Sequence, residues 1–278
     1  MTIKPHRSAL FLPASNRRAI EKAQGLPCDV VILDLEDAVA PEAKGEARAQ
    51  AVDAVRGGGF GARQVVVRIN ALTTPEGAAD ARALGEARPD AVLLPKVSRP
   101  ADITHAQALL RDLPIWAMIE TPAAVLALPA IAAVAGLECL VAGTNDLAKD
   151  LRCTPGEDRM PLLPHLAAIV VAARAHGLTA LDGVSNVLAE TEALVAECDQ
   201  GARLGFDGKT LIHPAQIAAA NRAFAPTEAQ IAEARAIVAA FAAPEAAGKG
   251  AIRVDGRMVE RLHLVASERV LALAAASA

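Results

Sequence analysis

The chain has 278 residues, a formal net charge of −4, and a composition that is 53% hydrophobic but only 2% aromatic. Its length suits one barrel domain with an appendage, or two ordinary domains. No apolar run reaches the ~18 residues of a membrane span, and the N-terminal apolar stretch is too short for a signal peptide. A basic stripe with stacking rings, typical of nucleic-acid binding, is absent. We therefore expect no nucleic-acid partner and no membrane partner.

Cysteine usage and the absence of common nucleotide motifs narrow the protein class further. The four cysteines are widely spaced, without a CxxC pair: Cys28, Cys139, Cys153 and Cys198. Such cysteines are typical of buried thiols in a reducing compartment, so we expect a cytoplasmic protein. Neither a Gly-x-Gly-x-x-Gly pattern nor a P-loop occurs, which leaves the Rossmann and P-loop folds without support.

Apolar runs that each stop at a polar or charged residue recur along the chain, and an Ala-rich, helix-like stretch follows each run. The expected strands are Ser8–Leu12, Asp29–Leu33, Val65–Ile69, Ala91–Leu94, Ile115–Ile119, Leu137–Ala142, Thr179–Leu181 and the short Ala202–Leu204. Strands that alternate with amphipathic helices predict parallel βαβ units. Eight such units predict an α/β fold, a closed (β/α)8 TIM barrel with a C-terminal helical extension.

Several connecting segments have a clear expected structure. Helices are expected over Asn16–Gln24 and over Lys44–Val55, where the glycines that follow end the second helix. The polar, proline-rich segment Arg152–Leu163 is expected to be a loop near the mouth of the active site. Two helical stretches, Pro214–Ala223 and Glu228–Ala242, follow the last strand.

We divide the chain into a barrel domain over residues 1–242, trailing helices included, and a C-terminal segment over residues 243–278. The segment PEAAGKG has the composition of a linker. The stretch after it predicts a short turn and then an amphipathic helix. Its apolar surface must pack on something, either its own barrel or a neighbouring subunit.

Polar side chains gather where the expected strands end, which is where a (β/α)8 barrel carries its active site. These residues are Glu36, Asp37, Arg68, Lys96, Glu120, Asn145, Asp146 and Asp182. Glu120 and Asp146 follow neighbouring strands directly. Two carboxylates on adjacent strand ends can share one Mg²⁺ and leave positions for substrate oxygens. The alternative is that each carboxylate only caps the helix after it.

Arg68 ends an apolar strand, where a guanidinium is costly unless it meets an anion. Because a guanidinium grips a carboxylate with two parallel hydrogen bonds, Arg68 favours a substrate-carboxylate site. The alternative is an internal salt bridge with Glu36 or Asp37. Asp34 and Glu36 share one face of their strand, so they need a cation or a basic partner, Arg68 or Lys96, to stay ionised together.

Two other side chains have weaker signals. Lys96, in LPKV, either holds a phosphate or carboxylate or is a structural lysine. His213, in GKTLIHPAQ, is expected to fix its loop by hydrogen bonds rather than to act as a base.

The chain resembles the citrate lyase β-subunit-like family of CoA-ester lyases. Eight segments carry the resemblance in order: RSALFLPASN, DVVILDLEDAV, VVRIN, AVLLPKV, IET, GTNDL, LGFDGKTLIHPAQ and VDGRMVERLH. They span nearly the whole chain, from about Arg7 to Ala276. Fold relatives of this family include the malyl-CoA lyases, the citramalyl-CoA lyases and the metal-dependent 2-oxo acid aldolases.

The resemblance assigns roles to residues of this sequence. It implies that Glu120 and Asp146 bind Mg²⁺, that Arg68 binds the carboxylate of the 2-oxo acid half, and that Glu36 is an outer-shell carboxylate. Gly143–Asp146 would form the loop whose backbone approaches that carboxylate. The residues expected to contact substrate are Arg17, Arg18 and Lys22, near the CoA phosphates, with Glu36, Arg68, Lys96, Glu120, Gly143, Thr144 and Asn145.

The implied activity is Mg²⁺-dependent cleavage of a carbon–carbon bond. The substrate would be a (3S)-3-hydroxyacyl-CoA such as malyl-CoA or citramalyl-CoA. The products would be an acyl-CoA and a 2-oxo acid, glyoxylate or pyruvate, and the reverse condensation is equally implied. Family members form homotrimers or hexamers in which the C-terminal segment covers a neighbour's site.

The sequence departs from the family pattern at the acid/base. The family has an Asp in a DGxMVD motif, whereas this chain has Glu260 in DGRMVERLH; Leu262 and Ala14 replace a usual Pro and Gly. The added methylene of Glu260 shifts the geometry of proton transfer. A malyl-CoA thioesterase on the same site is therefore an alternative. Others are a CoA-independent 2-oxo acid aldolase, a citrate lyase β subunit that works on a carrier protein, and a non-catalytic metabolite-binding barrel.

Overall fold

The structure, a computed structural model, describes residues 4–276. The chain divides into two compact units, one over His6–Phe224 and one that begins at Ala225 and includes Lys4 and Pro5. Helix α10 (Glu228–Ala242), which we grouped with the barrel from the sequence, therefore belongs to the second unit. Within residues 4–276, no helix has the length and apolar character needed to cross a membrane.

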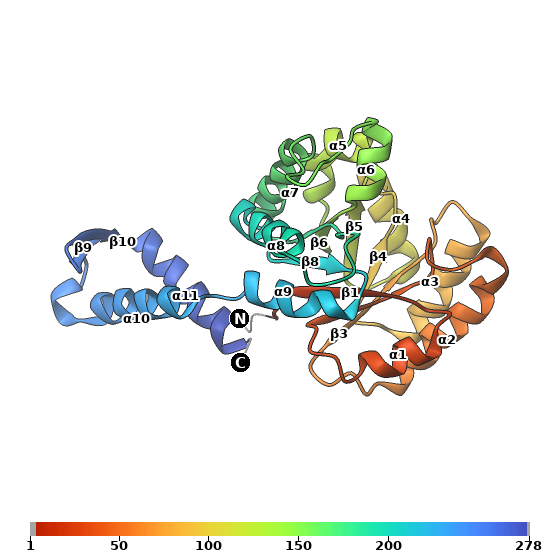
Figure 1. Ribbon diagram of the computed structural model, residues 1–278, viewed down its shortest axis with the longest axis horizontal. Coiled ribbons are helices and arrows are strands. Elements are labelled where there is room, and N and C mark those ends of the chain that lie inside the picture. Colours follow the sequence, from red (N-terminus) through yellow and green to blue (C-terminus); the bar gives the residue numbers. More distant parts are fainter. Residues whose placement is uncertain (1–3, 277–278) are drawn as a thin grey trace. The chain divides into compact units, whose positions relative to one another are not determined.

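The first unit is a closed barrel of eight parallel strands in chain order, as the sequence predicts (Figure 1). The strands are β1 (Ser8–Pro13), β2 (Val30–Asp34), β3 (Gln64–Arg68), β4 (Ala91–Leu94), β5 (Ile115–Ile119), β6 (Leu137–Ala142), β7 (Thr179–Asp182) and β8 (Gly208–Leu211). Each strand pairs with the next, and β8 closes the barrel on β1. The predicted fold class is confirmed.

The prediction for the last strand was wrong. Ala202–Leu204 is the end of helix α8 (Glu192–Leu204), and the strand itself is β8, four residues further on. Gly205, with φ of 97°, ends α8 in the left-handed conformation that glycine tolerates best. The sequence of β8, GKTL, contains a lysine and does not stand out as an apolar run.

Helices surround the barrel and several begin at a capping threonine. In α3 and α5, a threonine side chain (Thr74 or Thr121) accepts a hydrogen bond from the third helical N–H, and proline follows it. The remaining helices of this unit, beside α8, are α1 (Arg17–Ala23), α2 (Lys44–Gly57), α3 (Pro75–Ala87), α4 (Pro100–Leu110), α5 (Pro122–Ala132), α6 (Thr144–Leu151), α7 (Leu163–His176) and α9 (Ile217–Ala223). The expected helix over Pro214–Ala223 is a short 3-10 turn followed by α9.

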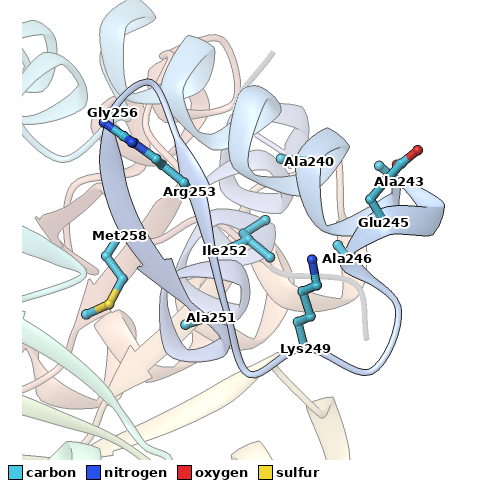
Figure 2. A pocket seen from close by; sticks show the side chains of 10 residues that line it. All are labelled: Ala240, Ala243, Glu245, Ala246, Lys249, Ala251, Ile252, Arg253, Gly256 and Met258. Carbon is cyan, nitrogen blue, oxygen red and sulfur yellow. The ribbon is translucent and has the colours of Figure 1, made fainter.

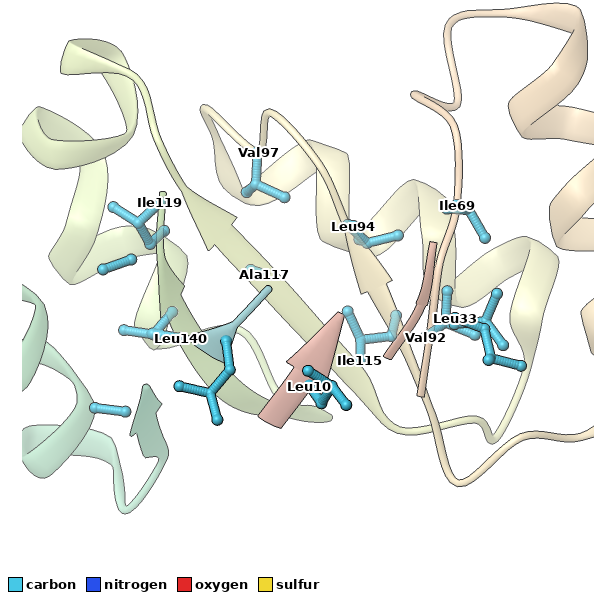
Figure 3. Packing of buried hydrophobic residues seen from close by; sticks show 14 of the residues in the cluster. Leu10, Leu33, Ile69, Val92, Leu94, Val97, Ile115, Ala117, Ile119 and Leu140 are labelled. Carbon is cyan, nitrogen blue, oxygen red and sulfur yellow. The ribbon is translucent and has the colours of Figure 1, made fainter. Parts of the chain in front are cut away.

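Strand residues alternate between two apolar layers. One layer lies inside the barrel and includes Ile32 and Val66, whereas the other packs against the helices and includes Leu33 (Figure 3). Because side chains alternate along a strand, the next inward positions after Ile32 and Val66 are Asp34 and Arg68. These two residues are paired in register on β2 and β3. The alternation therefore places an acid and a base at the carboxyl end of the barrel interior.

The C-terminal unit is built from α10, a hairpin and helix α11 (Arg261–Ala276). The expected short turn is an antiparallel hairpin of β9 (Ala251–Val254) and β10 (Arg257–Glu260). Its connection, Asp255 and Gly256, has positive φ at both residues, as a two-residue hairpin turn requires. A pocket of about 730 Å³ lies between the hairpin and the end of α10 (Figure 2).

Candidate active site

Arg68 is held inside the barrel by Asp34. Its Nε and Nη2 donate hydrogen bonds of 2.6 and 2.7 Å to the two oxygens of Asp34, which is 1% exposed. The guanidinium also lies over the ring of Phe11, 5.0 Å from its centre. Asp34 is one of the two acids for which the sequence predicts Arg68 or Lys96 as a basic partner, whereas the contact of Arg68 with Phe11 was not predicted. The two-pronged contact fixes the plane of the guanidinium and leaves Nη1 for other anions.

Glu36 joins Arg68 to Lys96. One oxygen of Glu36 lies 3.0 Å from Nη1 of Arg68, and the other accepts a hydrogen bond of 3.0 Å from Nζ of Lys96. Burial raises the pKa of Glu36, while the positive charge of Arg68 opposes this rise. Asp37 is more exposed and lies 3.8 Å from Arg68. The structure therefore contains the internal salt bridges that the sequence left open, and Glu36 forms the shorter one.

Glu120 follows β5 and points into the same end of the barrel. Its Oε1 accepts a hydrogen bond of 2.6 Å from the backbone N–H of Lys96, a residue with φ of 52°. Burial raises the pKa of Glu120 to about 7, and the charges of Glu36 and Asp146 act in the same direction. The carboxylate is thus short of positive partners, because the Lys96 ammonium is engaged with Glu36.

Gly143 presses against Glu120. A Cβ placed on Gly143 would lie 2.2 Å from Cβ and 2.7 Å from Oε2 of Glu120. Since the φ of Gly143 is negative, close approach rather than backbone conformation explains the need for glycine. The backbone of Gly143 therefore lies against Glu120, and its approach to a substrate carboxylate stays a prediction.

The next residues of that loop start α6. Thr144 is buried and Asn145 exposed; the two amide groups of Asn145 and Asn186 exchange hydrogen bonds of 3.2 and 3.0 Å. Asp146 is partly exposed, and its nearest cation, Lys149, is 4.0 Å away. Neither Glu120 nor Asp146 provides the side-chain cap of its helix: Thr121 caps α5, and α6 has no side-chain cap. The capping alternative for the two carboxylates is wrong.

These carboxylates suit a hard divalent cation. Glu120 and Asp146 offer only oxygen ligands, and Glu120 carries a raised pKa that a nearby cation would lower. Within residues 4–276, no group of three or more His, Cys, Asp or Glu side chains is arranged to hold a metal. Mg²⁺ commonly binds through one or two carboxylates and keeps waters or substrate oxygens in its other positions. The donor set therefore fits Mg²⁺.

Asp182 does not join this group, although it ends a strand as the others do. It points toward α8 and pairs with Lys209 and Arg159, and all three residues are buried. A residue at the end of a strand lies at the carboxyl end of the barrel. Its position in the sequence does not show whether the side chain faces the barrel interior or the helices. Lys209 lies within β8 and Arg159 in the loop before α7, and sequence reasoning missed both.

The other residues that the sequence singled out lie on α1 and in the loop after β8. Arg17, Arg18 and Lys22 are exposed on α1, directly after β1. His213 accepts a hydrogen bond at Nδ1 from the N–H of Ala215, which confirms its loop-fixing role. A pocket of about 750 Å³ borders Lys96 and is lined by residues of the loop after β3 and of the segment from β4 into α4. It provides room for a small molecule beside the charged group.

Glu260 belongs to the C-terminal unit, at the end of β10. Its backbone N–H donates a hydrogen bond of 3.0 Å to Nδ1 of His263, one turn into α11. The side chain of Glu260 is partly exposed. Met258, Leu262 and Val265 are each more than 60% exposed, so this end of the hairpin and helix presents apolar side chains.

Known proteins share both sequence and fold with this chain. It is 48% identical to a (3S)-malyl-CoA thioesterase of Cereibacter sphaeroides over 99% of this chain and 96% of that protein. It is 33% identical to an L-malyl-CoA/beta-methylmalyl-CoA lyase of the same species, over 96% and 94%. A solved structure of CitE from Mycobacterium tuberculosis with magnesium, acetoacetate and coenzyme A matches with a TM-score of 0.79 at 31% identity, covering 98% of both chains. The profile of the HpcH/HpaI aldolase/citrate lyase family matches residues 7–214. The chain belongs to the HpcH/HpaI aldolase/citrate lyase family.

Proposed function

We propose that the protein is a Mg²⁺-dependent (3S)-malyl-CoA thioesterase, which hydrolyses the thioester to malate and CoA. The observation that carries the proposal is the 48% identity, over 99% of the chain, to a protein of that name. Identity to the malyl-CoA lyase of the same species is 33%. The presence of Glu260 where the lyase motif has Asp supports the same choice.

Arg68 would bind the free carboxylate of the malyl group. Asp34 holds the guanidinium in one plane by two hydrogen bonds, so little side-chain freedom is lost when the substrate binds. A substrate carboxylate would compete with Glu36 for Nη1 of Arg68, and Lys96 beside it would keep the displaced Glu36 paired. Arg68 thereby fixes the position of the thioester relative to the other groups of the site.

Glu120 and Asp146 would hold Mg²⁺, with water and substrate oxygens completing its shell. When bound, the ion supplies positive charge that polarises the substrate oxygens it contacts. Glu120 stays oriented because the N–H of Lys96 holds its Oε1, while the absence of a side chain at Gly143 leaves space at Oε2. The N–H of Lys96 would thus leave Oε2 of Glu120 available to the ion.

Glu260 would act as the general base. It would remove a proton from water as that water attacks the thioester carbonyl, and the C–S bond would break to release CoA. We propose that this residue comes from the C-terminal segment, residues 243–278, of a neighbouring subunit in a homotrimer or hexamer. Exposed Met258, Leu262 and Val265 support an interface there. Arg17, Arg18 and Lys22 would contact the CoA phosphates, and four free cysteines support a cytoplasmic location.

A second candidate is carbon–carbon cleavage of malyl-CoA or citramalyl-CoA by the same site. Arg68, Glu120 and Asp146 are all present, and cleavage to an acyl-CoA and a 2-oxo acid requires the same carboxylate grip and the same cation. In that reaction Glu260 would exchange a proton at the α carbon of the departing acyl-CoA instead of activating water. A citrate lyase β subunit acting on a carrier protein is the remaining alternative.

Product analysis distinguishes these reactions. Purified protein, freed of metal with EDTA and supplied with Mg²⁺, is incubated with (3S)-malyl-CoA, and free CoA, malate, glyoxylate and acetyl-CoA are followed together. Glu120→Ala serves as the inactive control. Free CoA and malate in equal amounts, without glyoxylate, are the expected result. Glyoxylate with acetyl-CoA would show the lyase instead, and no turnover would point to the carrier-protein alternative.

A further inference from the structure

A buried ion cluster lies between β7, β8 and α8, outside the group of residues around Arg68. Asp182 and Lys209 are 0% exposed and Arg159 is 5% exposed. Nη1 of Arg159 lies 2.9 Å from both oxygens of Asp182, and Nζ of Lys209 lies 3.1 Å from one of them. Glu197 supplies the second carboxylate, 2.7 Å from Lys209. Buried ion pairs contribute little net stability compared with apolar side chains, so stability alone does not explain this cluster.

The cluster fixes the start of the segment after β7. Nζ of Lys209 donates to the carbonyl of Gly183 at 2.5 Å, and the N–H of Gly183 donates to Asp182 at 2.8 Å. Both polar groups of the Gly183 backbone are therefore bound to cluster members. Thr210 adds a hydrogen bond of 3.0 Å to the carbonyl of Asp182.

This fixed segment supports the loop that carries the candidate metal ligand. A Cβ on Gly183 would lie 2.5 Å from the side chain of Thr144, so the Thr144 side chain packs directly against the Gly183 backbone. The hydroxyl of Thr144 donates to the carbonyl of Val184 at 3.4 Å, and Asn145 exchanges hydrogen bonds with Asn186. The two residues directly before Asp146 thus rest on the segment that the cluster holds.

Arg159 attaches the loop after α6 to the same carboxylate, that of Asp182. It lies in the loop between α6 and α7, and its Nε also donates to Oε1 of Gln200 on α8 at 2.8 Å. Gln200 in turn donates to the carbonyl of Asp158 at 2.7 Å. Thr144, the first residue of α6, is therefore held against Gly183, and Arg159 holds the loop that follows α6, eight residues past the end of the helix. Both restraints converge on Asp182.

We propose that Asp182, Lys209 and Arg159 are positioning residues that set the Gly143–Asp146 loop, and with it the Asp146 carboxylate, for binding of the divalent cation. The cation part of this inference rests on the proposed function, whereas the placement of the loop does not. None of the three side chains needs to touch substrate. They act by making the ligand loop rigid before the cation arrives, which lowers the cost of binding it.

The test compares Arg159→Gln and the milder Arg159→Lys with Arg7→Gln. Arg7 is the control, because its side chain pairs with Asp29 by two hydrogen bonds of 2.8 and 2.9 Å before the start of β1. Its backbone carbonyl accepts a hydrogen bond of 3.1 Å from the N–H of Lys209, and a side-chain substitution keeps that contact. Two quantities are measured. Hydrogen–deuterium exchange of residues 143–151 in metal-free protein reports loop order, and isothermal titration calorimetry reports the Kd for Mg²⁺.

We expect Arg159→Gln to accelerate exchange over residues 143–151 and to raise the Kd for Mg²⁺ about 10- to 100-fold. Arg159→Lys keeps the charge but cannot make all the hydrogen bonds that the guanidinium makes to Asp182, Gln200 and Glu197, so it should fall between Arg159→Gln and the wild type. Arg7→Gln should leave both quantities within about twofold of the wild type while lowering Tm to a similar extent.

The inference is overturned if exchange over residues 143–151 is unchanged in Arg159→Gln, or if Arg7→Gln accelerates it equally. A wild-type protein that binds no Mg²⁺ would contradict the proposed function, yet the exchange comparison would still decide the positioning role. If Arg159→Gln does not fold, the comparison of Arg159→Lys with Arg7→Lys decides it by the same two quantities.

Discussion

The backbone N–H of Lys96 donates a 2.6 Å hydrogen bond to Oε1 of Glu120, while the ammonium group of the same residue bonds to Glu36. One residue in a left-handed conformation thus orients Glu120 without giving it a counter-charge. Glu120 is buried with a pKa raised to about 7, so its ionised form is disfavoured in the metal-free protein. The free energy of unfolding should therefore depend on whether Glu120 is protonated.

The metal-free protein should lose stability as the pH rises from 4.5 to about 7. In that range Glu120 keeps its proton in the folded state, because its pKa is raised from 4.5 to about 7, but loses it in the unfolded state. The part of this loss that Glu120 causes should reach at most about 3 kcal/mol. That part should be absent in Glu120→Gln, which keeps the contribution of Glu36, whose pKa is also raised. Urea unfolding at pH 5 and pH 8 in EDTA measures it, and Glu36 is present in both proteins. An identical pH dependence in the two proteins would contradict the assignment, and Mg²⁺ at pH 8 should restore stability to the wild type only.

Arg68→Lys should lower kcat/KM for (3S)-malyl-CoA about 100-fold. Lysine cannot make the two parallel hydrogen bonds to Asp34 and still bind a substrate carboxylate. The wild type should turn over 3-hydroxybutyryl-CoA slowly, because this thioester lacks that carboxylate. With it, Arg68→Lys should lower kcat/KM by less than about tenfold. Equal losses with both thioesters would mean that Arg68 maintains the structure and does not bind the carboxylate.

Gly143→Ala should weaken Mg²⁺ binding and activity much more than it lowers Tm. The added methyl would lie 2.2 Å from Cβ of Glu120, so Glu120 must move. Gly45→Ala is the matched control, because a Cβ at Gly45 meets nothing within 4 Å. Mg²⁺ titration by calorimetry and thermal unfolding of both variants measure the effect. A Gly143→Ala protein with unchanged Kd for Mg²⁺ would show that Glu120 is not a ligand.

Glu260→Asp should increase the share of carbon–carbon cleavage among the products of (3S)-malyl-CoA. The shorter side chain restores the family's carboxylate position and withdraws the base from the water that attacks the thioester. The ratio of glyoxylate to malate measures this share, and Glu268→Asp, further along α11, controls for general effects on the helix. A lower total rate with an unchanged ratio would mean that the length of this side chain does not select the reaction.

Leu262→Glu should break the proposed oligomer. Leu262 is 62% exposed on the C-terminal unit, beside exposed Met258 and Val265, and a buried, unpaired carboxylate at an interface is costly. Light scattering after gel filtration measures the molar mass of the particle. Leu126→Glu, at an 86% exposed leucine on α5, is the control and should leave the mass unchanged. A Leu262→Glu protein of wild-type mass would place the subunit interface elsewhere.

The barrel could be predicted from sequence because buried parallel strands are continuous apolar runs, such as the one over Ile115–Ile119. Strand β8 was not predicted, because Lys209 interrupts its apolar pattern. A lysine in a fully buried strand can be explained only when its partners, Asp182 and Glu197, are known. Propensity and pattern describe one segment at a time. The partners of Lys209 come from two other elements.

The candidate site was predictable in position but not in direction. Arg68, Glu120 and Asp146 were predicted from their places at the carboxyl ends of strands, whereas Gly143 and Thr144 were predicted from the family resemblance. Asp34 and Asp182 also end strands, yet only Asp34 points inward. Both faces of a barrel strand are apolar, so alternation alone cannot show which face lines the interior. Arg159 lies in a polar loop without periodicity, where no pattern indicates a long-range partner.

The surplus of acid around Arg68 sets the order in which ligands can arrive. Five carboxylates, those of Asp34, Glu36, Asp37, Glu120 and Asp146, surround the two cationic groups of Arg68 and Lys96. An anionic thioester approaching this site alone would meet repulsion at short range. If Mg²⁺ and the thioester bind as proposed, we expect Mg²⁺ to bind first. Steady-state kinetics should then show ordered binding, in which saturating thioester does not remove the requirement for Mg²⁺.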